Sequence, residues 1–122
     1  TVAEQDRVDA ALRALTPVLA GASLCLRGGP NRPPMEQGAS AALFSRAEWV
    51  ARSLGLPAVE AVGVGGASDG NFTAGVGTPT LDGLGAVGGG AHAPHEFVSV
   101  DRLVDRTRLV AGLVHDLLQE VS

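Results

Sequence analysis

Apolar residues recur at helical spacing in three segments of this chain. Residues 3–19, 40–54 and 101–120 each carry aliphatic side chains three or four positions apart, which is typical of amphipathic helices. The predicted buried face of the second helix comprises Leu43, Phe44, Ala47, Val50, Ala51 and Leu54. That of the third helix, the longest, comprises Leu103, Val104, Val110, Leu113, Val114, Leu117 and Leu118.

Polar residues and glycines mark where these helices begin and end. Ser40 is the predicted N-cap of the second helix, because its hydroxyl can accept a hydrogen bond from the first turn. Gly55 stands just past the expected end of that helix. Ser99 or Asp101 is expected to begin the last helix.

Short apolar runs between the helices predict strands. They cover residues 22–26, 59–64 and 80–81, and a short helix is expected over residues 71–76. Strands that alternate with helices imply an α/β fold. The proline-rich segment 27–34 cannot be regular structure, because proline lacks an N–H donor and fixes φ, so it is the best candidate for a domain boundary.

Composition excludes several functional classes. The chain has 122 residues, 45% hydrophobic and 18% charged, as expected for one globular domain with a modest core. A net charge of −4 disfavours nucleic-acid binding. No apolar run approaches the roughly 20 residues that span a bilayer, and residues 1–5 lack signal-peptide features, so we expect a cytoplasmic protein without membrane contact. All basic residues are arginine, which excludes a phosphate-loop or Schiff-base lysine, and the single Cys25 cannot form an internal disulfide.

A glycine-rich loop over residues 63–72 is the first candidate site. Gly63, Gly65 and Ser68 give an imperfect dinucleotide fingerprint, which we judge a weak signal because serine replaces the third glycine. Backbone N–H groups at such a turn can also bind an anion, for example a substrate carboxylate. The structural alternative is a tight turn in which Ser68 or Asp69 caps the short helix, and the sequence leaves both possibilities open.

Two further groups of residues carry candidate chemistry. His92, His95 and Glu96 offer metal ligands, but the spacing of the two histidines is not the i, i+4 spacing of zinc peptidases, so the segment predicts at most one ligand. A surface position is the alternative for His92. Arg32 lies among prolines, and a guanidinium on a stiff loop is suited to bind a carboxylate. On the residues alone, a solvent-facing arginine at a domain boundary is the favoured alternative.

Five motifs in order resemble a known family. They are RGGPNRPPM at 27–35, GGASDGNF at 65–72, GTPTLDGLG at 77–85, GGGAH at 88–92 and EFV at 96–98. This series resembles the C-terminal part of the di-zinc exopeptidases and deacylases. That family includes glutamate carboxypeptidase, aminoacylase, acetylornithine deacetylase and succinyl-diaminopimelate desuccinylase, and the glutamate carboxypeptidase branch is the most similar.

The resemblance implies a division of the chain and a set of site residues. Residues 1–27 would be the remnant of an inserted αβ lid and dimerisation domain, a helix plus an edge strand, and residues 28–122 the C-terminal part of the catalytic domain. His92 takes the place of the family's C-terminal zinc ligand. Arg32 takes that of the arginine that binds the substrate carboxylate. The loop that lines the substrate pocket falls on Gly65, Gly66 and Ala67.

The resemblance also implies the reaction. The intact enzyme would use two zinc ions, or cobalt or manganese, to cleave a small peptide or N-acyl amino acid with a free carboxylate, and it would be a homodimer. The general base and the other metal ligands belong to an N-terminal part that this chain lacks, so the chain alone is expected to be inactive. A non-catalytic α/β binding or interaction module is the alternative function.

Overall fold

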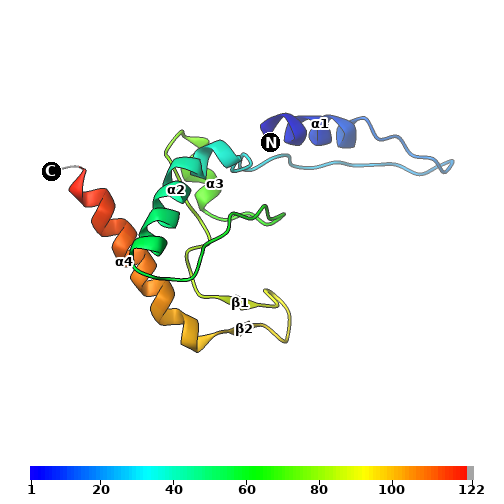
Figure 1. The fold of residues 1–122 in the computed structure, drawn as a ribbon. Coiled ribbons are helices and arrows are strands. Elements are labelled where there is room, and N and C mark those ends of the chain that lie inside the picture. Colours follow the sequence, from blue (N-terminus) through cyan, green and yellow to red (C-terminus); the bar gives the residue numbers. More distant parts are fainter. Residues whose placement is uncertain (121–122) are drawn as a thin grey trace.

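Helices dominate the structure, a computed structural model that describes residues 1–120 (Figure 1). Its elements are α1 (Val2–Arg13), α2 (Gln37–Ser53), α3 (Gly70–Gly75), β1 (Gly88–Gly89), β2 (Phe97–Val98), the 3₁₀ helix η1 (Val100–Arg102) and α4 (Leu103–Gln119). β1 and β2 pair antiparallel, with Gly88 opposite Val98 and Gly89 opposite Phe97. The four α-helices and this small sheet agree with a mixed α/β composition in that coarse sense. The division into a lid remnant and a catalytic part stays a prediction.

The core lies between α2 and α4. Its five fully buried side chains are Ala47, Val50 and Ala51 on α2 and Leu109 and Leu113 on α4. The helical spacing correctly places four of these five on buried faces, because residues three or four apart share one side of a helix. Leu109 was missed by the predicted stripe, and it is the largest side chain that is fully buried. Several loop residues pack partly against this cluster, namely Leu56, Val59, Leu81 and Leu84, together with Leu117 of α4.

The predicted strands at 22–26, 59–64 and 80–81 are wrong for this structure. None of these segments has a ladder partner among residues 1–120. A strand exists only where a neighbouring strand satisfies its N–H and C=O groups. In the segment 80–81, the Thr80 N–H donates instead to the Ala39 carbonyl of α2 at 2.9 Å.

Two helix boundaries also differ from the prediction. α1 ends at Arg13 rather than near residue 19, and the chain beyond it turns back at residues 19–22, where the Ala22 N–H donates to the Leu19 carbonyl. α2 begins at Gln37, so Ser40 lies inside the helix, and its hydroxyl donates to the Gln37 carbonyl at 3.2 Å. The predicted cap at Ser40 is therefore wrong.

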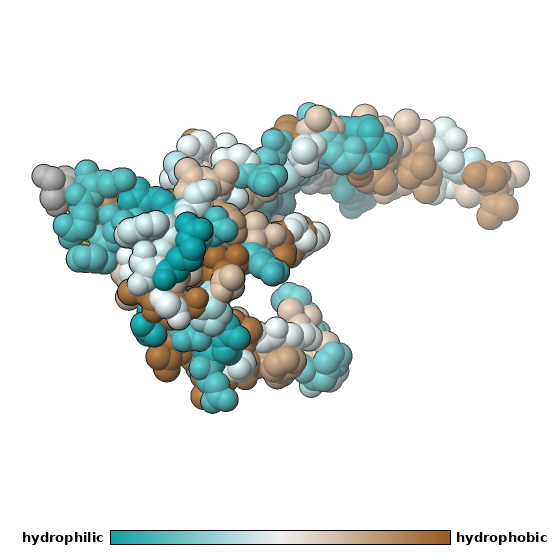
Figure 2. Space-filling model, viewed as in Figure 1, coloured by the Kyte–Doolittle hydropathy of each residue, from teal (hydrophilic) through white to brown (hydrophobic). Residues whose placement is uncertain are grey.

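Three segments project from the helical body on one side (Figure 1). They are α1 with the arm of residues 14–31, the loop that precedes α3, and the β1–β2 hairpin. Aliphatic side chains on these segments lie open to solvent, with Val18 98% and Val64 77% exposed. Figure 2 shows apolar surface out to the tip of the arm. Among residues 1–120, no helix has the length and apolar character that a membrane span requires.

Candidate functional site

Arg32 packs against residues 68–72, the C-terminal part of the glycine-rich loop. Its Nη1 donates to the Ser68 carbonyl at 3.0 Å, and its Cζ lies 4.3 Å from the centre of the Phe72 ring. The hydrogen bond is partly shielded from solvent, and both contacts join residues far apart in the sequence. The structure therefore brings the predicted carboxylate-binding arginine next to the predicted substrate loop.

Two further contacts hold the backbone carbonyls of Arg32 and of the next residue, Pro33. Gln5 on α1 donates from Nε2 to the Arg32 carbonyl at 2.8 Å, and Asn71 donates from Nδ2 to the Pro33 carbonyl at 2.9 Å. α3 also meets the Pro33 ring directly, since a Cβ on Gly75 would lie 2.5 Å from Pro33 Cγ. This close approach explains why glycine stands at position 75.

The turn before α3 is stabilised by Ser68 and Asp82. The Ser68 hydroxyl donates to Asp82 Oδ2 and accepts the Gly70 N–H at 3.1 Å, while the Gly83 N–H donates to Asp82 Oδ1 at 2.7 Å. These bonds hold the pKa of the Asp82 carboxyl below its ordinary value, because they favour the ionised form. The Ser68 hydroxyl has the larger effect, and the Gly83 N–H has the smaller one. Asp69 is the N-cap of α3 by position, but its side chain makes no capping bond, and the Ser68 hydroxyl bonds the first turn instead.

Gly65, Gly66 and Ala67 are exposed, and their N–H groups have no hydrogen-bond partner within residues 1–120. Unpaired backbone donors on a loop next to an arginine are suited to an anion. A dinucleotide site is not supported, because its fingerprint requires a strand directly before the loop and residues 59–64 form none.

His92 lies in the loop that joins β1 to β2. It is the one non-glycine residue with a positive φ, 66°, in the described part of the chain. Its N–H donates to Glu96 Oε2 at 3.3 Å, and its exposed imidazole has no bond to any residue of 1–120. A non-glycine residue in the left-handed region is uncommon, although histidine adopts it more often than most residues, and such residues gather at functional sites.

The β1–β2 hairpin itself depends on its glycines. A Cβ on Gly88 would collide with the Phe97 carbonyl across the pair, and Gly90 has a φ of 68° with the His95 ring over it. The glycines at 88 and 90 therefore allow the two strands to approach closely and the chain to turn, and this tight hairpin places His92 in its loop.

Against families of known proteins, the model for Peptidase family M20/M25/M40 matches residues 23–116. The chain belongs to this family. The match covers most of the chain, including Arg32, the loop at 65–67 and His92, and it makes the protein one of a family of metal-dependent hydrolases. No curated protein and no solved structure matches the chain.

The metal centre that the peptidase family implies is not formed by the described residues alone. Within residues 1–120 there is no group of three His, Cys, Asp or Glu side chains able to hold an ion. His92 offers a single imidazole, whereas a catalytic zinc site has three protein ligands. Among residues 1–120, no hydrogen bond or ion pair links the hairpin to Arg32, and Figure 1 shows the hairpin away from α3.

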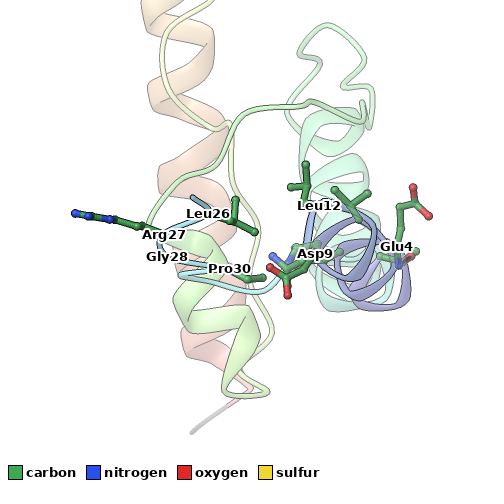
Figure 3. A pocket seen from close by; sticks show the side chains of 12 residues that line it. Glu4, Asp9, Leu12, Leu26, Arg27, Gly28 and Pro30 are labelled. Atoms are coloured by element: carbon green, nitrogen blue, oxygen red, sulfur yellow. Dashed lines mark hydrogen bonds between the residues drawn. The ribbon is translucent and has the colours of Figure 1, made fainter. Parts of the chain in front are cut away.

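An apolar cavity of about 560 Å³ lies between α1 and the returning arm (Figure 3). Val8 and Leu12 of α1 face Leu26 across it, and Arg13 joins the two sides by donating to the Gly28 carbonyl at 3.0 Å. Neither Arg32 nor His92 lines it. The sequence does not predict this cavity, because the cavity depends on the arm folding back along α1.

No role was predicted for Phe72, Asn71 or Asp82. Phe72 and Asn71 belong to the motif GGASDGNF, in which substrate binding was predicted for the first three residues only. The position of Phe72 and Asn71 at the end of the glycine-rich loop was a usable signal, whereas the contact with Arg32 required the fold.

Proposed function

We propose that this chain is the C-terminal part of a metal-dependent exopeptidase or N-acyl amino acid amidohydrolase of the glutamate carboxypeptidase type. Its substrate is a small peptide or N-acyl amino acid with a free carboxylate. The general base and the remaining ligands of a two-zinc centre belong to a part of the enzyme outside these residues. The chain alone is then inactive.

The position of Arg32 beside the loop at 65–67 is the observation that carries the proposal. The guanidinium binds a carboxylate through two parallel N–H bonds, and the unpaired N–H groups of the loop complete an anion-binding surface. Binding the carboxylate far from the reacting amide contributes to catalysis by orienting that amide.

The backbone of His92 supports its role as a metal ligand. The backbone of His92 is in the left-handed region, and its exposed imidazole has no hydrogen-bond partner in the described chain, so the ring itself makes no hydrogen bond that stabilises the hairpin. In the proposal, His92 supplies one ligand from this hairpin, and the rest of the enzyme supplies the others. Cobalt or manganese are possible replacements for zinc in such a site.

Exposed apolar surface supports the assignment to a larger enzyme. The segments predicted as strands carry aliphatic side chains but no partner strands, and Val62 is 74% and Val64 77% exposed. Surface of this kind is covered by another sheet or by a partner in stable proteins. The same observation is compatible with the second candidate, a non-catalytic binding module that recruits a partner through this face.

The test measures metal content and amide hydrolysis in the intact gene product. We expect about two metal ions per chain, falling toward one in His92→Ala, with loss of hydrolysis. His95→Ala, in the same loop, is the matched control and should retain both. Absence of bound metal in the intact product, or unchanged metal content in His92→Ala, would contradict the enzyme assignment and favour the binding module.

A further inference from the structure

The guanidinium of Arg32 is held on one face and at one nitrogen. The Phe72 ring lies under it, 4.3 Å from Cζ, and Nη1 donates to the Ser68 carbonyl at 3.0 Å. An arginine has five N–H donors. Ser68 takes one of them, and the others have no partner in the part of the chain that the structure describes. A planar cation with a fixed face and unused donors along its edge matches the plane of a carboxylate.

Phe72 contributes little to the stability of the fold. Its side chain is 46% exposed and lies outside the core between α2 and α4. α3 is held in place by other groups, because Asn71 bonds the Pro33 carbonyl at 2.9 Å and Gly75 packs against the Pro33 ring. Loss of the ring therefore leaves α3 docked and removes mainly the stacking surface for Arg32.

We propose that Phe72 is a positioning residue that fixes the guanidinium plane of Arg32 for binding of the substrate carboxylate. This inference rests on the proposed function and deepens it. Without the ring, the long arginine side chain samples several rotamers, and binding a carboxylate then requires ordering it first. The ring supplies this order before the substrate arrives, so its effect is specific to ligands with a free carboxylate.

The experiment uses the intact gene product and two ligands that differ in one group, an N-acyl amino acid and its C-terminal carboxamide. Calorimetry measures the affinity for each ligand, and initial rates give KM and kcat. For Phe72→Leu we expect roughly 2- to 30-fold weaker binding of the acid, the range typical of cation–π contacts. This weaker binding of the acid should raise KM and leave kcat unchanged, and binding of the carboxamide should be unchanged.

Phe72→Tyr keeps a ring face under Arg32 and should retain wild-type affinity for the acid, whereas Arg32→Ala sets the maximum loss. Equal weakening of both ligands in Phe72→Leu, or no weakening of either, overturns the positioning role. Hydrolysis by the wild-type enzyme is measured separately. If the wild-type protein does not hydrolyse the N-acyl amino acid, the proposed amidohydrolase function is wrong. If Phe72→Leu still loses affinity only for the acid, the carboxylate site is supported independently of that function.

Discussion

The left-handed backbone of His92 allows its structural and chemical roles to be separated by two substitutions. His92→Ala and His92→Gly both remove the imidazole, and both keep the N–H that donates to Glu96 at 3.3 Å. They differ in backbone preference at φ 66°. The left-handed conformation costs alanine roughly 1–2 kcal/mol, whereas glycine adopts it without this cost. The greater flexibility of the unfolded chain at glycine destabilises the folded state by about 0.5–1 kcal/mol and offsets part of this difference. A net difference of about 1 kcal/mol in favour of glycine remains.

Hydrogen exchange of the Ser99 amide measures this difference. The Ser99 N–H donates to the Val87 carbonyl at 2.8 Å, beside the β1–β2 pair, so its exchange reports local opening of the hairpin. With metal removed by a chelator, we expect exchange about fivefold slower in His92→Gly than in His92→Ala, since 1.4 kcal/mol corresponds to a factor of about ten. Equal exchange rates in the two variants would refute the argument from strain.

Metal content of the same two variants tests the chemical role. If His92 is a ligand, each variant of the intact product loses one ion to the same extent, whatever the hairpin stability. If His92→Ala loses more metal than His92→Gly, in proportion to its faster hairpin opening, the histidine acts only through the stability of the hairpin.

Two further predictions concern stability. Leu109→Ala should lower the free energy of unfolding by about 2–5 kcal/mol, because the fully buried leucine packs in a cluster with small residues of α2, which cannot fill the cavity. Val104→Ala is the control on the same helix, at a position 64% exposed, and should change the free energy of unfolding by less than about 0.5 kcal/mol. Urea unfolding followed by the fluorescence of the single tryptophan measures both values. The pKa of Asp82 is lower in the folded state than in the unfolded state, where it is about 3.9. Its ionised carboxylate therefore stabilises the fold above the unfolded-state pKa, and this contribution is lost as the pH falls through the folded-state pKa. Asp82→Asn should remove this dependence, and an unchanged slope of unfolding free energy against pH in that variant would contradict the role of the Ser68 bond.

The sequence predicted the helices better than the strands. α2 and α4 follow from spacing alone, because each buries one face against the other and their apolar residues recur every three or four positions. Strands at 22–26 and 59–64 were predicted from equally apolar runs but do not form. Their hydrogen bonds depend on a neighbouring strand, and a local pattern carries no information about whether a neighbour exists.

The predicted site shows the same division between local and tertiary information. Arg32, the loop at 65–67 and His92 were predicted as site residues from ordered motifs, and their roles stay predictions, although the match to the peptidase family spans all of these positions. Phe72 and Asp82 were missed, because a stacking contact and a hydroxyl–carboxylate bond join residues distant in sequence. The positive φ of His92 was equally invisible, since only the closure of the hairpin imposes it.

The sequence by itself determined the amphipathic helices, the family and the residue types available for chemistry, because these depend on local periodicity and on ordered motifs. The tertiary structure alone decided that Leu109 is the largest fully buried side chain and that Phe72 lies under Arg32. It also decided that the hairpin presents His92 with a strained backbone. Burial, stacking and strain arise when distant segments meet, so they become defined only when the chain has folded.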